Sequence, residues 1–234
     1  MKILALDSTA VVGTVALCED QKLVAHYTLN TGNTHSQTLL PMIESVLRSA
    51  EWELDEIDLF AVSQGPGSFT GVRIGIATIK GLAFGKSIPC AGVSTLEALA
   101  YNLRCFDGIL CPVMNARRAQ VYNALFRCKD GVISRLCPDR AISITELDQE
   151  LAGIDAPIYL VGDGYDVTIE GLSKTAVCPV PEEMRMQSGY SVAMCGLAAY
   201  QNGQATDDTA LAPVYLRQSQ AERERAERLA NQNT

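Results

Sequence analysis

The sequence is short of histidine and lacks any long apolar run. Only His26 and His35 are present among 234 residues, which excludes a histidine-rich metal centre. No apolar stretch approaches the roughly 20 residues that span a bilayer. Asp7 interrupts the first apolar stretch too early for a secretion signal. We therefore expect a soluble, cytoplasmic protein without a membrane segment.

Positive charge is also in deficit. The 19 lysines and arginines face 27 aspartates and glutamates, so the net charge is −8. An acidic surface repels nucleic-acid backbones, which argues against direct, tight binding of RNA or DNA. A basic partner protein or a local basic patch would still connect such a chain to RNA.

The cysteines lack the paired CxxC spacing of zinc and redox sites. All eight are dispersed: Cys18, Cys90, Cys105, Cys111, Cys128, Cys137, Cys178 and Cys195. In a chain without a secretion signal, this pattern is typical of buried free thiols rather than disulfides or metal ligands.

What is present is a regular order of apolar segments, with 47% of the residues hydrophobic. The patterns predict strands at 3–6, 11–17, 23–29, 59–62 and 88–93 and helices at 33–49, 72–84 and 94–101. Ser94 and Glu97 predict a capping box at the start of the last helix. Three antiparallel strands followed by alternating helices and strands predict an α/β fold, the mixed sheet of the ribonuclease-H-like core found in actin and hexokinase.

The pattern starts again in the second half of the chain. It predicts strands at 109–114, 120–128, 132–136 and 158–161 and helices at 143–151 and 188–201. Their order resembles a degraded second copy of the first core. We thus expect a first lobe over 1–103 that is completed by 205–217, a smaller second lobe over 104–204, and a charged tail over 218–234.

Two loops of the first half are candidate binding sites. Asp7, Ser8 and Thr9 end a strand and resemble the first phosphate turn of actin-like ATPases, in which an acidic residue holds Mg²⁺ or orients water. The alternative is a plain Asx or ST turn. The second loop, from Gly65 to Gly71, reads GPGSFTG and fits neither the Walker nor the GxGxxG pattern.

The GPGSFTG loop still places glycines between a strand and a helix. Such a helix start binds anions, although the alternative is that the glycines allow close packing of the chain. Together the two loops predict a vestigial cofactor site with Asp7, Ser8, Thr9, Gly65 and Gly67.

The helix after this loop contains several glycines, including Gly71, Gly75 and Gly81. Each glycine inside a helix costs about 0.5–1 kcal/mol relative to alanine, so several of them need a packing reason. We expect one side of this helix to face its own sheet and another side to face a second polypeptide.

Several long motifs resemble the TsaB family, formerly called YeaZ. They are THSQTLLPMIESVL, GPGSFTGVRIG, GVSTLEALA, NARRAQVYNALF, LVGDG and PVYLR. The resemblance implies a two-lobed actin-like (ASKHA) fold and a role in making threonylcarbamoyladenosine on tRNA beside the anticodon. It implies a non-catalytic subunit that pairs with the related TsaD and with the ATPase TsaE, so that ATP, ADP and metal belong to partner subunits and this chain has no cofactor of its own.

The residues agree with the absence of catalysis. Relatives of the TsaD type carry an HxxxH pair of metal ligands where this chain has Thr95 and Leu99, and leucine cannot bind a metal. No Cys-His, Ser-His-Asp or HExxH arrangement supports a peptidase. One departure from the family is Asn115, which replaces an aspartate before Arg117 and Arg118. We expect these arginines to form salt bridges elsewhere on the surface.

The resemblance and the glycine-rich face predict the interface. We expect helices 35–49 and 71–85 to pair with like helices of TsaD, or with a second copy of this chain when TsaD is absent. The expected interface residues are His35, Leu39, Leu40, Ile43, Leu47, Gly71, Val72, Ile74, Gly75, Thr78 and Leu82. Two alternatives are a stand-alone actin-fold ATPase or kinase that uses Asp7, the 65–71 loop and Mg²⁺, and a stand-alone chaperone or regulator.

Overall fold

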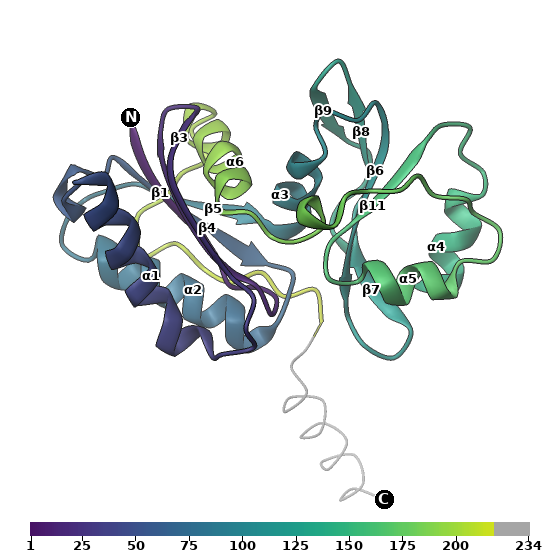
Figure 1. Ribbon diagram of the computed structural model, residues 1–234, viewed down its shortest axis with the longest axis horizontal. Coiled ribbons are helices and arrows are strands. Elements are labelled where there is room, and N and C mark those ends of the chain that lie inside the picture. Colours follow the sequence, from purple (N-terminus) through teal and green to yellow (C-terminus); the bar gives the residue numbers. More distant parts are fainter. Residues whose placement is uncertain (218–234) are drawn as a thin grey trace, which may run out of the picture.

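Short strands and helices alternate along the chain and build two lobes that lie side by side (Figure 1). The computed structural model describes residues 1–217, and the charged tail expected at 218–234 lies outside them. Within the described residues, no helix is long and apolar enough to cross a membrane.

The first lobe is built on a five-stranded sheet of order β3-β2-β1-β4-β5. Its strands are β1 (Lys2–Asp7), β2 (Gly13–Glu19), β3 (Lys22–Leu29), β4 (Leu59–Gly65) and β5 (Cys90–Ser94). The first three are antiparallel, whereas β4 pairs with β1 and β5 pairs with β4 in parallel. Strand β1 is therefore central, and its apolar side chains are buried on both faces of the sheet.

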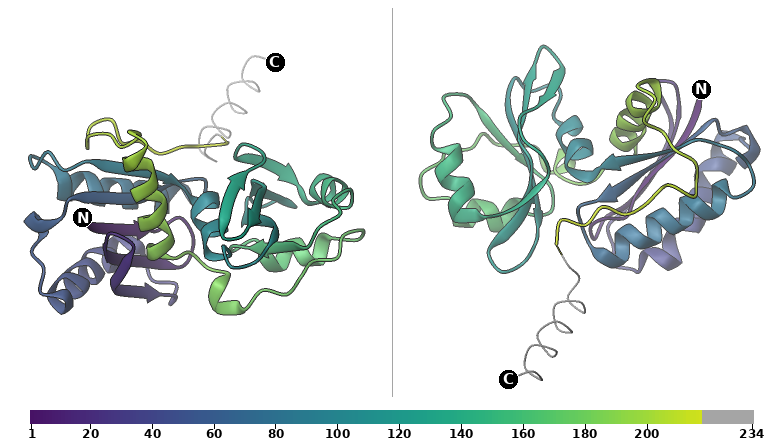
Figure 2. Two further views of the ribbon diagram at one scale, coloured as in Figure 1. Left: turned by 90° about the horizontal axis from the view of Figure 1, so that it is seen from above. Right: turned by 180° about the vertical axis from the view of Figure 1, so that it is seen from behind.

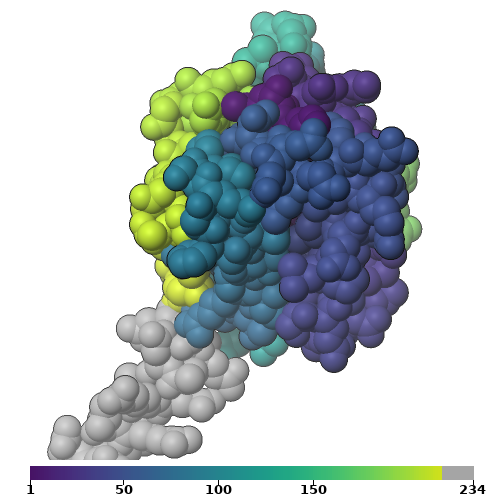
Figure 3. All heavy atoms as spheres, turned by 90° about the vertical axis from the view of Figure 1, so that its left-hand side faces the viewer, coloured from purple at the N-terminus to yellow at the C-terminus, as the bar shows by residue number. Residues whose placement is uncertain are grey.

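Helices cover both faces of this sheet (Figure 2). They are α1 (His35–Ala50), α2 (Phe69–Ala83), α3 (Thr95–Asn102) and α6 (Gly189–Gln201). Alternate residues of β1 point to opposite faces. Leu4 and Leu6 pack in the core beneath α1 and α2, whereas Ile3 and Ala5 pack in the core beneath α6. Helices α1 and α2 form one outer face of the molecule (Figure 3).

The second lobe contains a six-stranded sheet of order β10-β7-β6-β8-β9, with β11 beside β6. Its strands are β6 (Gly108–Asn115), β7 (Gln120–Asn123), β8 (Phe126–Lys129), β9 (Val132–Arg135), β10 (Arg140–Ser143) and β11 (Ile158–Val161). Helices α4 (Ile144–Leu151) and α5 (Tyr165–Gly171) complete the second lobe. Two 3₁₀ turns also occur in the chain, one at Leu54–Glu56 before β4 and one at Glu182–Met184 before α6.

The prediction of a single strand over 120–128 is wrong, because the strand is interrupted at Ala124 and Leu125. Strand β7 pairs with the end of β6 and β8 pairs with its beginning. The break lies opposite Pro112, which has no backbone N–H to donate to a neighbouring strand. The side-chain amide of Asn123 fills the gap by donating to the carbonyl oxygens of Pro112 and Ala124, each at 3.0 Å.

Three further expectations need correction. Helix α6 packs against β1, β2, β4 and β5 of the first sheet, so the second lobe does not extend to residue 204. Strand β2 begins at Gly13 rather than Val11, and α2 begins at Phe69 rather than Val72. Ser94 accepts from the backbone N–H of Glu97 as expected, but the Glu97 carboxylate pairs with Arg135 of the second lobe instead of closing a capping box.

The last described segment runs back along the first lobe, and we call residues 205–217 the C-terminal strap. Thr206 and Cys90 exchange two backbone hydrogen bonds of 2.7 and 2.8 Å, and the Val214 N–H donates to the Gln64 carbonyl at 2.7 Å. The Lys80 ammonium donates to two carbonyl oxygens of the strap. The strap thus ends near the start of α2, between the lobes (Figure 2).

The glycines of α2 face two different environments, which gives a testable contrast in stability. A Cβ at Gly71 would collide with the backbone carbonyl oxygen of Ser8, whereas a Cβ at Gly81 would meet no atom within 4 Å. We expect Gly71→Ala to lower the free energy of unfolding by about 1–3 kcal/mol through overpacking. We expect Gly81→Ala to raise it by about 0.5–1 kcal/mol through helix propensity. Urea unfolding of both variants checks this, and equal effects would contradict the packing of α2.

Candidate functional site

The turn after β1 is held by its own side chains. One oxygen of Asp7, Oδ1, accepts from the backbone N–H and the hydroxyl of Thr9, both at 2.7 Å, and Oδ2 accepts from the Ser63 hydroxyl at 2.5 Å. Burial raises the pKa of Asp7, and these hydrogen bonds oppose the rise. The local geometry is the Asx turn that the sequence left open as an alternative.

The glycine loop packs directly onto this turn. The Ser68 N–H donates to the Thr9 carbonyl at 2.7 Å, and the Ser8 hydroxyl donates to the Gly71 carbonyl at 2.9 Å. A Cβ at Gly67 would lie 2.6 Å from the Thr9 carbonyl oxygen. Ser8 is buried in the contact between the two loops, whereas Thr9 and Gly67 also line an open cleft between the lobes, so the vestigial cofactor site expected at these residues remains a prediction. The remaining glycine of that set, Gly65, instead approaches the Val214 carbonyl of the C-terminal strap.

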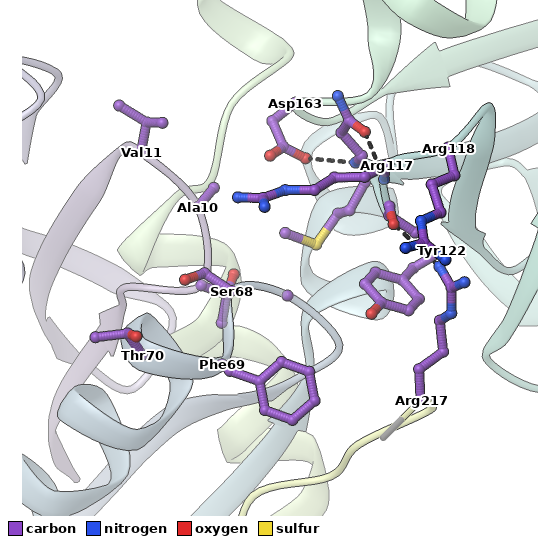
Figure 4. A pocket seen from close by; sticks show the side chains of 15 residues that line it. Ala10, Val11, Ser68, Phe69, Thr70, Arg117, Arg118, Tyr122, Asp163 and Arg217 are labelled. Carbon is purple, nitrogen blue, oxygen red and sulfur yellow. Dashed lines mark hydrogen bonds between the residues drawn. The ribbon is translucent and has the colours of Figure 1, made fainter. Parts of the chain in front are cut away.

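An open cleft of about 730 Å³ lies beside these loops, between the two lobes (Figure 4). Four regions of the sequence meet there: the β1–β2 loop, the start of α2, the second lobe, and the C-terminal strap. The lining residues include Thr9, Ala10, Val11, Ser68, Phe69, Thr70, Met114, Asn115, Arg117, Arg118, Tyr122, Asp163 and Arg217.

The cleft is basic although the whole chain is acidic. Among residues 1–217, Arg117, Arg118 and Arg217 line it together with a single carboxylate, that of Asp163. Burial raises the pKa of Asp163 to about 6. The hydrogen bond of 3.3 Å from the Asn115 N–H to Asp163 Oδ1 opposes this rise, whereas the charge of Asp7 adds to it. The salt bridges expected for Arg117 and Arg118 are not formed with any residue in 1–217.

An unusual turn carries two of these arginines. Arg117, Arg118 and Ala119 have φ angles of 62°, 56° and 53°, which side-chain-bearing residues rarely adopt. Asn115 supports the turn, because its side-chain oxygen accepts from the Arg117 N–H at 2.8 Å. Asn115 therefore acts as a hydrogen-bond acceptor at the start of this turn. The sequence motifs NARR, LVGDG and PVYLR contain the charged residues of the cleft, but nothing in their spacing shows that they meet.

The expected interface residues divide into two groups. Leu39, Ile43, Val72, Gly71 and Gly75 are buried against the chain's own sheet and turn, so they do not lie on its exposed surface. For Gly75, an added Cβ would lie 2.6 Å from the Ser8 hydroxyl oxygen. These residues are buried because the apolar side of an amphipathic helix packs on the core of its own chain first.

His35 also turns inward, since its Nε2 lies 2.7 Å from the Ala10 carbonyl oxygen. Leu40 is 51% exposed, and Leu47, Ile74, Thr78 and Leu82 are partly exposed. These five residues remain on or near the outer face of α1 and α2.

The similarity to known proteins extends over nearly the whole chain. The family described as TsaD, tRNA N6-adenosine threonylcarbamoyltransferase, matches residues 23–224. The tRNA threonylcarbamoyladenosine biosynthesis protein TsaB of Bacillus subtilis (strain 168) is 32% identical over 95% of this chain and 96% of its own length. The chain belongs to the TsaB family. The family's protein from Escherichia coli (strain K12) is 29% identical over 94% of this chain and 96% of its own length.

Solved structures confirm the fold. The structure titled YeaZ from Pseudomonas aeruginosa, 24% identical, has a TM-score of 0.78 and covers 92% of this chain and 99% of its own. The ethanolamine utilization protein EutJ from Carboxydothermus hydrogenoformans, 14% identical, has a TM-score of 0.52 and covers 84% and 90%. The two-lobed, actin-like α/β fold predicted from the sequence is thus confirmed for this member of the family.

Asp163 gives a prediction for the dependence of stability on pH. Because its folded pKa is raised, the carboxyl favours folding below its ordinary value near 3.8, and this contribution is lost as the pH rises through about 6. Asp163→Asn retains an acceptor for Asn115 and removes the charge. We expect it to raise the free energy of unfolding at pH 7.5 by on the order of 1 kcal/mol, and by clearly less at pH 4.5, where the folded carboxyl is still protonated.

Urea midpoints at the two pH values measure this difference. The exposed loop residue Asp155 offers the matched control Asp155→Asn, for which no such pH-dependent gain is expected. A gain for Asp163→Asn at pH 4.5 as large as that at pH 7.5 would contradict a carboxyl that is penalised in its ionised form.

Proposed function

We propose that this chain is a non-catalytic scaffold subunit of the complex that forms N6-threonylcarbamoyladenosine in tRNA, and that it binds and activates TsaD. The proposal rests on membership of the TsaB family and on the exposed apolar and small residues of the outer face of α1 and α2. Partner subunits then supply ATP, metal and the transfer chemistry.

The packing of the first lobe supports a non-catalytic role. The Asp7 carboxylate is occupied by hydrogen bonds from Thr9 and Ser63, and the chain's own glycine loop packs on the turn. Thr95 and Leu99, which stand where TsaD-like relatives have metal-binding histidines, are both fully buried. Neither position presents a ligand to a metal. A chain of this structure is suited to holding a partner rather than to turning over nucleotide, which argues against the ATPase or kinase alternative.

The outer face of α1 and α2 suits a helical partner. Leu40 and Ile74 supply apolar surface, while Ala77 and Gly81 are small and exposed. Small residues on a helix surface let the backbone of another helix approach closely. Since TsaD belongs to the same wider family, a like pair of helices on TsaD would pack here in a pseudo-symmetric bundle. The same face would pair two copies of this chain when TsaD is absent.

The charge of the chain fits a supporting role in RNA modification. With a net charge of −8, it is poorly suited to hold tRNA tightly by itself. TsaD and TsaE, within the proposed complex, would therefore make the main contacts with tRNA and nucleotide. This division of tasks also disfavours a stand-alone chaperone or regulator.

Leu40 tests the interface. We expect Leu40→Glu to weaken association with TsaD at least tenfold, because it places a charge in the apolar centre of the proposed helix bundle. Leu136 lies on the second lobe and is similarly exposed, at 48% against 51%, so Leu136→Glu is the matched control. Analytical ultracentrifugation of mixtures with TsaD measures the association.

Formation of threonylcarbamoyladenosine by this chain with TsaD and TsaE gives a second readout. Leu40→Glu should reduce it, and an excess of the variant should restore part of it. Full modification in the absence of this chain, or robust ATP hydrolysis by the pure chain, would overturn the proposed function. Equal association of both variants would overturn the placement of the interface.

A further inference from the structure

Helix α3 is the junction between the two lobes. It lies against the first sheet and also packs on β6 of the second lobe (Figure 1). One hydrophobic cluster joins the helix to the second sheet, and it includes Leu96, Leu99 and Leu103 of α3 with Leu110, Met114 and Phe126. Hydrophobic contact is non-directional, so this packing holds the lobes together but leaves small rotations of one lobe against the other open.

A polar network ties the start of α3 to the second lobe. The hydroxyl of Ser94, which caps α3, donates to the Asp139 carboxylate at 2.6 Å. Arg135 of β9 pairs with the same carboxylate through one guanidinium nitrogen and with Glu97 of α3 through the other, at 3.2 Å. Hydrogen bonds weaken steeply when they are bent or lengthened. The network therefore resists rotation of the second lobe at this end of the helix.

This network differs from an isolated surface salt bridge, which contributes little because both side chains are mobile and solvated. The guanidinium of Arg135 lies over the ring of the buried Phe126, 4.5 Å from its centroid. The ring positions the guanidinium in advance, so less side-chain freedom is lost when the two carboxylates bind. The side chain of Asp139 is only 16% exposed and has Ser94 as a second donor. Arg135 is thus held by the second lobe and reaches the first.

The other end of α3 is tied to the second lobe by Asn102. Its side-chain nitrogen donates to the carbonyl oxygens of Met184 and Met186, at 3.1 and 2.8 Å. These residues lie on the segment by which the chain returns from the second lobe to α6. The segment is itself fastened to the second lobe, because the Gly162 N–H donates to the Arg185 carbonyl at 2.7 Å. With both ends of α3 tied, the remaining freedom is rotation about the helix itself.

The C-terminal strap supplies a third tie. The Arg217 guanidinium donates to the Ala116 carbonyl of the second lobe at 3.0 Å, away from α3 (Figure 1). The strap is fixed on the first lobe by backbone hydrogen bonds to Cys90 and Gln64. A contact at a distance from the helix opposes the rotation that the two ends of α3 leave open.

Three points that are not on one line fix the position of a rigid body. We propose that the ties at Arg135, Asn102 and Arg217 form a lock that holds the two lobes of this chain at one angle. The tie at Arg135 prevents rocking about the line that joins the other two. The second lobe then keeps one position relative to the outer face of α1 and α2. This inference concerns the chain by itself and does not rest on the proposed function.

Residual dipolar couplings of the backbone amides test the lock in the full chain, labelled with nitrogen-15 and dissolved in a weakly aligning medium. The couplings of one rigid body fit one alignment tensor, whereas a lobe that moves against the other has a tensor of different magnitude. We expect one tensor to fit both lobes of the unaltered chain. Arg135→Gln removes the charge that joins Glu97 to Asp139, so the two lobes should then need tensors of unequal magnitude.

Asp139→Asn is a second variant, because it keeps an acceptor for Ser94 and removes the charge that holds Arg135. The matched control is Arg127→Gln on β8, since Arg127 is exposed and forms no salt bridge with any residue in 1–217. The control should retain the common tensor, and the dispersion of the amide spectrum shows whether each variant is folded.

Unequal tensors in the unaltered chain would overturn the lock. A common tensor retained in both Arg135→Gln and Asp139→Asn would overturn the role of Arg135, as would an equal loss in the Arg127→Gln control. None of these results bears on association with TsaD, so the two proposals fail separately.

Discussion

The contact between the glycine loop and the turn after β1 is the constraint on which the rest of the structure depends. It needs residues without side chains at Gly67 and Gly71, because the backbone carbonyls of Thr9 and Ser8 occupy the space where a Cβ would lie. This contact fixes where α2 begins and how closely it lies on the sheet. It also buries Ser8 between the turn and the helix that follows the loop.

The distribution of charge and apolar surface follows from that arrangement. Within residues 1–217, the cationic side chains that line the cleft are arginines of the second lobe and of the strap. With the inner side of α2 packed on its own sheet, the small residues left exposed, such as Ala77 and Gly81, lie on the outer face. The chain therefore has two separate surfaces: an outer helical face with exposed small residues and a cleft lined by arginines.

The sequence predicts most of the elements but not their orientation. Strands β1 to β4 and helix α1 have clear apolar periods, and the structure contains them with small shifts. The break in 120–128 depends on Pro112 in a neighbouring strand, and α6 lies on the first lobe because of tertiary packing that no local pattern records. A glycine on a helix does not show which way it faces, so Gly75 and Gly81 cannot be distinguished without coordinates. The cleft joins segments more than 200 residues apart, from Ala10 to Arg217.

Hydrogen exchange of this chain with and without TsaD tests most directly whether the outer helical face is the docking surface. Amide protection reports which segments a partner covers or stabilises. We expect slower exchange in α1 and α2 on binding and little change across β8 and β9 of the second lobe. Slower exchange confined to the second lobe, with α1 and α2 unchanged, would contradict it.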